Sequence, residues 1–285
     1  MNKKPVIIGI GELLWDMLPS GKKAGGAPIN FVYHASQVGA ESYAITAVGN
    51  DPLGDEIVKE VGRAGINAIA ERVDYPTGKV LVELKEGIPS YTIIENVAWD
   101  HIPLTDPMKE IAKKADAVCF GTLAQRSEES RNTIQTFLSL TPPHVYRILD
   151  INLRQHYYSE EIIASSLEKS NVLKMNEEEL KLLKRLFSLD HLSDENACRW
   201  FIEKFNLQFL ILTAGDNYST ILTPDNSSYI KTPKVEVVDT VGAGDAFTGA
   251  FITAILQGKS LQEAHLTAVD RSAFVCTRPG AWVTR

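Results

Sequence analysis

The stretch DTVGAGDAF occupies residues 239–247 and places small residues where a loop enters a helix. Gly242 and Gly244 allow the backbone to approach a ligand closely. The first N–H groups of the following helix point outward at its positive end, where they can bind a phosphate. Asp245 lies at the same helix start, where its carboxylate could accept the proton of an attacking hydroxyl. The alternative is a glycine-rich turn followed by an ordinary acidic residue of a first helical turn.

Two common nucleotide-binding patterns do not occur in the sequence. A GxGxxG dinucleotide pattern would need a glycine at position 247 or 14, where the chain has Phe247 and Leu14. A GxxxxGK[ST] phosphate loop is also missing. A nicotinamide oxidoreductase is therefore not expected, and the helix start near residue 242 is the predicted phosphate site.

Strand-like and helix-like segments alternate along the 285 residues. Short apolar runs predict strands at 6–10, 43–48, 117–120, 146–151, 171–174 and 209–213. Helices are expected at 27–38, 53–64, 127–140, 177–187, 244–256 and 261–276. This alternation favours a mostly parallel sheet covered by helices on both faces.

One region departs from that alternation. Two alternating runs, 79–85 and 90–95, flank a predicted turn at 86–89 and indicate an antiparallel hairpin. Such a hairpin is either an embellishment of a sheet edge or a lid that excludes water from a site.

The composition is that of an ordinary globular protein, with 44% hydrophobic and 23% charged residues. A net charge of −7 without a basic block argues against nucleic-acid binding. No stretch approaches the ~20 apolar residues of a membrane helix, and no signal-peptide cleavage site follows the N-terminus, so a cytoplasmic protein without membrane partners is expected. Cys119, Cys198 and Cys276 lie far apart, as expected for reduced thiols.

The 239–247 stretch resembles the second signature of the ribokinase-like (PfkB) family of carbohydrate kinases. The first signature of that family is matched by GGAPINF at 25–31, running on to Gly39, and the resemblance covers essentially the whole chain. It implies a three-layer α/β/α sandwich with a mostly parallel central sheet and a small β-sheet lid. The chain would form a single kinase domain, 1–285, with lid segments at about 12–26 and 73–100.

The resemblance also implies the reaction, which is transfer of the ATP γ-phosphoryl group to a sugar hydroxyl. Asp245 would be the catalytic base, and Gly242, Ala243 and Gly244 would line the anion hole for the transferring group. A catalytically inactive sugar sensor on the same fold is the alternative from another functional class. The intact catalytic motif argues against that alternative.

Three positions that match the family's sugar ligands, and two further stretches, indicate the sugar. Asp16, Gly26 and Asn30 match positions that bind sugar hydroxyls, with loop caps as the alternative for Asp16 and Asn30. GELLWDMLP at 11–19 and GTLAQRS at 121–127 resemble the fructokinase branch. D-fructose is therefore the expected substrate, followed by 2-keto-3-deoxygluconate, whose carboxylate demands a cation, and by ribose.

A metal site is implied by the segment KMNEEE at 174–179. Asn176 and Glu179 have the spacing of the family's NxxE motif and share one face of a helix start. An amide and a carboxylate suit the water-rich shell of Mg²⁺. The alternative is a solvated acidic helix N-terminus.

The remaining nucleotide contacts are less specific. Thr213 and Gly215 resemble the loop that touches the nucleotide, and the small Ala268 and Ser272 could line an adenine groove or serve helix packing. Arg154, in DINLR at 150–154, would meet a phosphate or the sugar, or form a surface ion pair.

The resemblance also bears on a monovalent cation site and on the oligomeric state. CTRPGA at 276–281 resembles the family's closing loop, where some members hold a monovalent cation together with the motif aspartate, here Asp239. The resemblance therefore admits a K⁺ site, and it also admits a homodimer formed through the lid.

Overall fold

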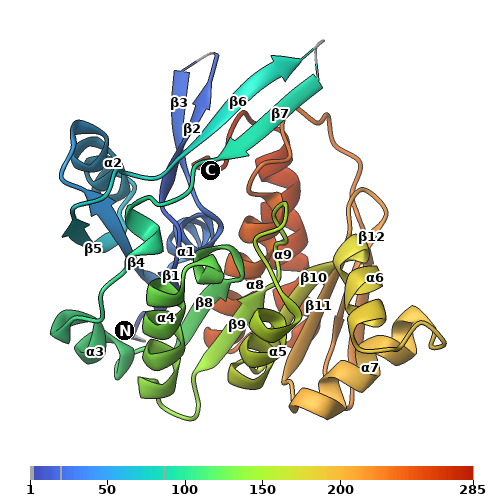
Figure 1. Ribbon diagram of the computed structural model, residues 1–285. Helices are drawn as coiled ribbons and strands as arrows, with labels where there is room; N and C mark the ends of the chain where they lie inside the picture. The colour runs from blue at the N-terminus through green and yellow to red at the C-terminus, as the bar shows by residue number, and fades with distance from the viewer. Residues whose placement is uncertain (1–2, 20, 86–87, 285) are drawn as a thin grey trace.

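The computed structural model describes residues 3–19, 21–85 and 88–284. A large nine-stranded sheet has the order β13-β12-β11-β10-β9-β8-β1-β4-β5, and helices cover both of its faces (Figure 1). All neighbouring pairs from β5 across to β11 are parallel, whereas β12 and β13 are antiparallel additions at one edge. The mostly parallel sheet expected from the alternating segments is therefore present.

The strands of this sheet are β1 Val6–Ile10, β4 Glu41–Gly49, β5 Asn67–Val73, β8 Ala117–Gly121, β9 Tyr146–Asp150, β10 Val172–Asn176, β11 Phe209–Ala214, β12 Tyr218–Leu222 and β13 Ser227–Lys231. The helices are α1 Ala27–Gln37, α2 Pro52–Arg63, α3 Asp106–Ala112, α4 Glu128–Leu140, α5 Glu160–Lys169, α6 Glu177–Leu186, α7 Asp194–Phe205, α8 Ala243–Leu256 and α9 Leu261–Cys276, with 3₁₀ turns at Ala98–Asp100 and Leu123–Arg126. Within the ranges that the structure describes, none of these helices is both long and apolar enough to cross a membrane.

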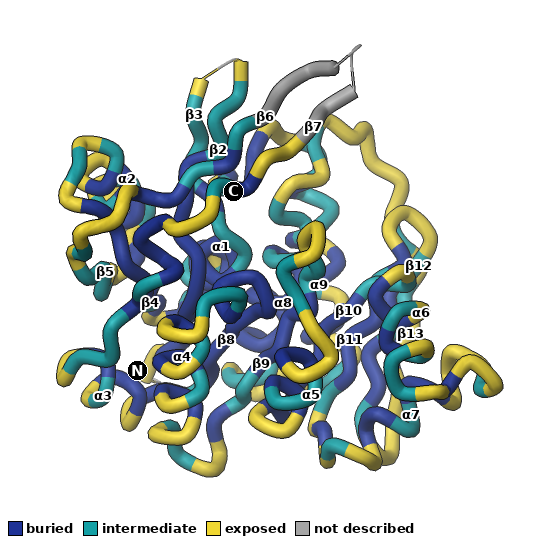
Figure 2. The backbone as a smooth tube through the Cα atoms, viewed as in Figure 1, coloured by how far each residue is buried: buried dark blue, intermediate teal, exposed yellow. Residues whose placement is uncertain are grey.

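Two apolar layers lie on the opposite faces of the large sheet. Helices α3 to α7 bury one layer, which includes Phe120, Phe137 and Phe201. Helices α1, α2, α8 and α9 bury the other, which includes Phe31 and Phe251. The inner strands β1, β4, β8 and β10 are almost continuously buried (Figure 2), as expected for parallel strands covered on both sides, whereas the edge strands β5 and β13 are mostly partly or fully exposed.

A separate four-stranded sheet stands above the large one (Figure 1). Its order is β3-β2-β6-β7, formed by β2 Leu14–Leu18, β3 Gly21–Gly25, β6 Lys79–Lys85 and β7 Ile88–Ile93. Strands β2 and β6 pair in parallel, so two segments distant in sequence meet there.

The hairpin β6–β7 differs from the prediction at both ends of its second strand, which was expected at 90–95 and spans Ile88–Ile93. Its second strand begins at Ile88, so Ile88 and Pro89 belong to β7 and not to the turn, and Glu86 and Gly87 lie outside the described residues. Because β7 is an edge strand, a proline there removes no N–H group that the sheet needs.

Candidate active site

The site lies where the parallel strands of the large sheet end. Asp150 is the last residue of β9, Asn176 is the last residue of β10, and Gly11 directly follows β1. The N-terminus of α8 reaches the same region, because Asp245 on α8 contacts Asn30 on α1. Ligands of open α/β sheets commonly bind at this edge.

Asp245 occupies the first turn of α8, which begins directly after Gly242. Its Oδ2 accepts a hydrogen bond of 2.8 Å from Nδ2 of Asn30. The pKa of Asp245 is raised to about 6, mainly by burial and also by the nearby Asp150 carboxylate, while the Lys174 ammonium acts in the opposite direction. The structure thus brings the predicted catalytic base, Asp245, into contact with a predicted sugar ligand, Asn30.

The orientation of Asn30 is determined by a residue that sequence reasoning missed. Trp282 donates from Nε1 to Oδ1 of Asn30 at 2.8 Å, and its ring stacks on Tyr33 with the centroids 5.5 Å apart. An indole can only donate, so the amide oxygen must face Trp282 and the amide NH₂ must face Asp245. No motif marks Trp282, which lies far from Asn30 in the sequence.

The segment that carries Trp282 is held by a buried imidazole. His34 donates from Nε2 to the carbonyl oxygen of Ala281 at 2.9 Å, and its Nδ1 accepts from Nε of Arg271 at 3.1 Å. Burial is the main reason that the pKa of His34 falls to about 3, so the ring is neutral in this role. Close approach also explains Gly242, since a Cβ there would lie 2.7 Å from Cβ of Ala281.

Asp239 joins the beginning of the motif to the predicted closing loop. Its Oδ1 accepts from the backbone N–H of Val241 at 3.0 Å, and its Oδ2 accepts from that of Gly280 at 2.8 Å. These bonds account for Asp239 structurally, and a K⁺ site beside it stays a prediction.

A buried ion pair lies beside the predicted anion hole, and sequence reasoning assigned no role to either partner. Lys174 of β10 is 7% exposed, Asp150 of β9 is 3% exposed, and Nζ lies 3.0 Å from Oδ1. A Cβ on Gly244 would lie 3.2 Å from Nζ of Lys174. Asp150 lies in the stretch 150–154, where Arg154 was the predicted ligand. Lys174 lies in the stretch 174–179, where Asn176 and Glu179 were the predicted metal ligands.

Two cations accompany Asp16 on β2. Burial raises the pKa of the Asp16 carboxyl to about 6, and the charges of Arg154 and Lys23 act in the opposite direction. Arg154 is exposed and donates to the carbonyl oxygen of its neighbour Leu153 at 3.0 Å. Among the interactions of the described residues, no carboxylate lies within ion-pair distance of Lys23 or Arg154.

Gly26 connects the small sheet to α1, and its conformation explains the glycine. It has φ 118°, and a Cβ there would lie 2.1 Å from the carbonyl oxygen of Glu12. Glu12 itself is buried, and its Oε1 accepts from the backbone N–H of Ala27 at 3.3 Å. Burial raises the pKa of Glu12 to about 7. Sequence reasoning assigned no role to Glu12.

Asn176 and Glu179 form a reciprocal cap at the start of α6. Asn176 Oδ1 accepts from the Glu179 N–H at 2.9 Å, and Glu179 Oε2 accepts from the Asn176 N–H at 2.8 Å. The other oxygen, Oε1, accepts from the N–H of Leu153 at 3.0 Å. No cluster of three or more acidic, histidine or cysteine side chains suits a metal within the described ranges. Both oxygens of Glu179 thus already accept a backbone hydrogen bond, and binding of Mg²⁺ by this pair through intervening waters stays a prediction.

The predicted nucleotide residues lie on β11, its following turn and α9. Thr213 is partly buried near the end of β11, and Gly215 follows with φ 54°. Ala268 is fully buried in the apolar layer under α9, whereas Ser272, one turn later, is partly buried. Contact of any of them with a nucleotide stays a prediction.

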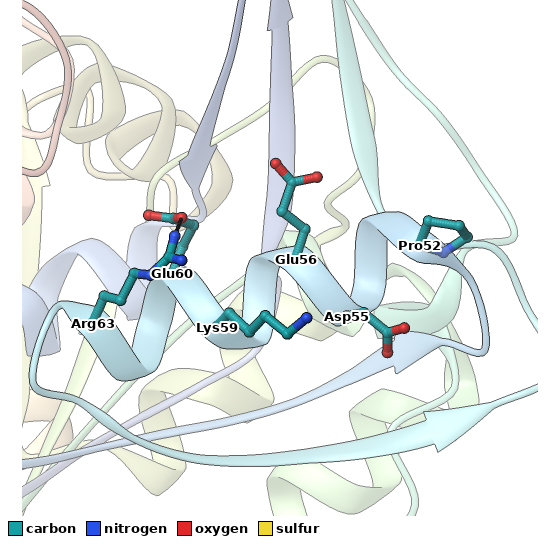
Figure 3. A pocket seen from close by; sticks show the side chains of 6 residues that line it. All are labelled: Pro52, Asp55, Glu56, Lys59, Glu60 and Arg63. Atoms are coloured by element: carbon teal, nitrogen blue, oxygen red, sulfur yellow. Dashed lines mark hydrogen bonds and ion pairs between the residues drawn. The ribbon is translucent and has the colours of Figure 1, made fainter.

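Figure 3 shows a hollow over α2 that contains none of the predicted site residues; it is lined by Pro52, Asp55, Glu56, Lys59, Glu60 and Arg63. Glu56 instead links α2 to the small sheet through an ion pair of 2.5 Å with Lys22 of β3. A second hollow lies between β3 and the closing loop, where Lys23 faces Gly280 and Trp282.

Known proteins resemble this chain over nearly its whole length. An uncharacterized sugar kinase of Pyrococcus horikoshii is 27% identical over 300 residues, covering 98% of this chain and 92% of that protein. Its crystal structure has a TM-score of 0.85 at 25% identity, covering 98% of this chain and 94% of that one. The structural match confirms the predicted ribokinase-like α/β fold, with a large mostly parallel sheet and a small separate one.

Two further relatives have named substrates. An ATP-dependent 6-phosphofructokinase of Thermoanaerobacterium thermosaccharolyticum is 26% identical, covering 99% of this chain and 91% of that protein. A fructokinase of Rhizobium leguminosarum is 23% identical, covering 94% and 85% respectively. The family model described as "pfkB family carbohydrate kinase" matches residues 20–284. The chain therefore belongs to the pfkB family of carbohydrate kinases.

Proposed function

We propose that this carbohydrate kinase transfers the γ-phosphoryl group of ATP to a hydroxyl of D-fructose, with Asp245 as the general base. The observation that carries the proposal is the bond of 2.8 Å between Asn30 Nδ2 and Asp245 Oδ2 at the N-terminus of α8. It joins an expected sugar ligand to the expected base. The fructokinase and 6-phosphofructokinase relatives support a ketose as the acceptor.

In this mechanism Asp245 accepts the hydroxyl proton as the sugar oxygen bonds to the γ-phosphorus. The bond from that phosphorus to the β–γ bridging oxygen breaks, and ADP leaves with the electron pair. The N–H groups that line the proposed anion hole stabilise the charge on the moving group; they belong to Gly242, Ala243 and Gly244. Mg²⁺, bound through water by Asn176 and Glu179, would neutralise phosphate charge.

The sugar would lie beneath the small sheet, between Asp16 and Asn30, with Gly26 at the junction of this sheet and α1. A carboxylate and an amide provide both acceptors and donors for neutral hydroxyls. Segments 12–26 and 73–100 would act as a lid and exclude water from the transfer. The adenosine part of ATP would be bound by Thr213, Gly215, Ala268 and Ser272.

An anionic sugar is the second candidate, and one observation favours it. Lys23 and Arg154 both act on Asp16 electrostatically without a close carboxylate partner among the described residues. Two such cations could bind the carboxylate of 2-keto-3-deoxygluconate or the phosphate of a phosphorylated ketose. Ribose ranks third, and a sensor that binds sugar without turnover is the alternative outside catalysis.

The deciding experiment measures ADP release with fructose, ribose, glucose and 2-keto-3-deoxygluconate. We expect fructose to give the highest kcat/KM, because a pocket matched to neutral hydroxyls leaves polar groups unpaired with other sugars. A higher value for the keto acid would replace fructose by the second candidate. Sugar binding in calorimetry without ADP release would indicate a sensor.

A homodimer through the small sheet is part of the proposal, since β3 and β7 are its edge strands and an exposed edge can pair with a second copy. Light scattering at several protein concentrations tests it. We also propose that the protein is cytoplasmic. A K⁺ ion would bind beside Asp239, and comparing kcat in KCl with kcat in NaCl tests this site.

A further inference from the structure

Lys174 carries a buried positive charge that the proposed roles do not use. It lies on β10 and is 7% exposed, and its ammonium bonds Oδ1 of Asp150 on the neighbouring strand at 3.0 Å. Burying an ammonium is costly unless it is paired. An ammonium has three N–H donors, and the bond to Asp150 engages one of them.

The ammonium of Lys174 faces the N-terminus of α8. A Cβ on Gly244 would lie 3.2 Å from Nζ of Lys174 and 3.6 Å from its Cε. Gly244 therefore leaves free the space between the charge and the first turn of the helix. That first turn also carries Asp245, whose carboxylate interacts electrostatically with Lys174.

Another buried cation of the chain, Arg126, is engaged by more groups than Lys174, although its Nη1 has no hydrogen-bond partner among the described residues. Arg126 makes three hydrogen bonds of 2.7–2.8 Å, to Asp100 and the carbonyl oxygen of Ile94, and lies over the rings of Trp99 and Tyr157 at 4.0 and 4.6 Å. Lys174 makes one hydrogen bond among the interactions of the described residues.

The ion pair is one of three register positions between β9 and β10. The other two are the apolar pairs of Val172 with Ile148 and Leu173 with Leu149. A buried ion pair adds little net stability compared with an apolar pair of similar volume. A contribution to folding stability therefore explains the Lys174–Asp150 pair poorly. Its position beside Gly244 suits the binding of an anion there.

We propose that Lys174 is a further catalytic residue whose ammonium contacts the phosphoryl group during its transfer, and that Asp150 is a positioning residue that holds this ammonium. The inference rests on the proposed function in one respect, that transfer takes place at the N-terminus of α8. As negative charge redistributes over the moving phosphoryl oxygens, a cation already in place stabilises them without reorganisation.

The test compares Lys174→Met and the double variant Lys174→Met/Asp150→Asn with the wild type. The double variant guards against a folding defect, because it does not leave a carboxylate buried without its counter-ion. Lys184→Met is the matched control. Lys184 lies on α6, which follows β10, and its Nζ also pairs with an aspartate, lying 2.7 Å from Oδ1 of Asp194. Far-UV circular dichroism and urea unfolding verify the fold of each variant.

We expect kcat to fall about 10²–10³-fold in both Lys174 variants, the typical loss for one donor to the transferring group. Calorimetry should show little change in the affinity for ADP with Mg²⁺. Affinity for ADP, aluminium fluoride and sugar together, which imitate the moving phosphoryl group, should fall by a similar factor to kcat. Lys184→Met should leave all three quantities close to those of the wild type.

The assay uses whichever of the four sugars the wild type phosphorylates fastest, so an error in the fructose assignment leaves the comparison intact. A folded double variant with kcat near the wild-type value would overturn the proposal. Equal losses of affinity for ADP alone and for the aluminium fluoride complex would also overturn it, because they indicate a structural role.

Discussion

Replacing Asp245 by asparagine removes the proposed base and retains the size of the side chain. Asn30 can still donate to the remaining oxygen, since the bond of 2.8 Å to Asp245 Oδ2 needs only an acceptor. An amide cannot take the proton of the attacking hydroxyl. The substitution therefore separates the contact to Asn30 from proton acceptance.

The expected loss follows from the contribution of a positioned base. General-base catalysis typically contributes ~10²–10⁴-fold, which corresponds to about 3–5 kcal/mol on the barrier. Burial supports a large effect, because it raises the pKa of Asp245 from 3.8 to about 6, closer to neutral pH. ATP affinity should change little, since the carboxylate is assigned to the sugar hydroxyl.

The raised pKa also gives pH dependence with a definite sign. The kcat of the wild type should fall as the pH drops through about 6, where Asp245 takes up a proton, and the variant should lack this limb. Asp16 also has a pKa of about 6, but as a sugar ligand it should act on the KM for the sugar. An acid whose folded pKa exceeds its unfolded value of 3.8 destabilises the folded state when ionised, that is above both values. At pH 8 the free energy of unfolding of Asp245→Asn should therefore exceed that of the wild type, by at most on the order of 3 kcal/mol. The difference should vanish towards pH 3.

The assay couples ADP release to a spectrophotometric signal at pH 5–9 and is accompanied by urea unfolding at pH 4 and pH 8. Asp270→Asn, an exposed position on α9, is the control and should match the wild type. A folded Asp245→Asn variant that retains most of the wild-type kcat would refute the base assignment. A lost rate with an unchanged acidic limb would refute the assignment of that pKa to Asp245.

Three further predictions address the metal, the sugar and the orientation of Asn30. Glu179→Gln should raise the Mg²⁺ concentration for half-maximal rate, whereas a variant that is less stable but has an unchanged Mg²⁺ titration would leave Glu179 with its capping role alone. Asp16→Ala should raise the KM for fructose and spare that for ATP; an equal rise in both would contradict its assignment to the sugar. Trp282→Phe keeps an aromatic ring against Tyr33 but leaves the Asn30 oxygen without its donor, at a cost of about 1 kcal/mol in unfolding free energy. Its kcat should also fall, and an unaltered kcat in the folded variant would show that Trp282 does not control the amide.

Local patterns predicted the part of the fold that repeats. Apolar runs of strand length between helical segments identified the parallel strands β1, β4, β8, β9, β10 and β11, because strands that are buried on both faces read as continuous apolar stretches. The edge strand β5, which is partly exposed, and the antiparallel strands β12 and β13 were not predicted. Helices α3, α5 and α7 were also missed, although Ser193 caps α7 and Phe201 and Ile202 lie on its buried face.

The hairpin boundary illustrates the limit of turn signals. Glycine and proline at 86–89 predicted a turn across all four positions, yet β7 already begins at Ile88. A proline marks either a turn or an edge strand, and only the neighbouring strand shows which of them applies.

The sequence by itself determined the chemistry of the centre: the glycines and Asp245 at one helix start, and the family to which this motif belongs. These features are local, since a helix N-terminus and its loop are encoded within a few residues. Only the tertiary structure decided which side chains surround that centre. Trp282 contacts Asn30 across 252 residues, and Lys174 meets Asp150 across 24 residues, through the pairing of two strands. Contacts of this kind depend on how the sheet orders its strands, and no local pattern of a single sequence reports that order.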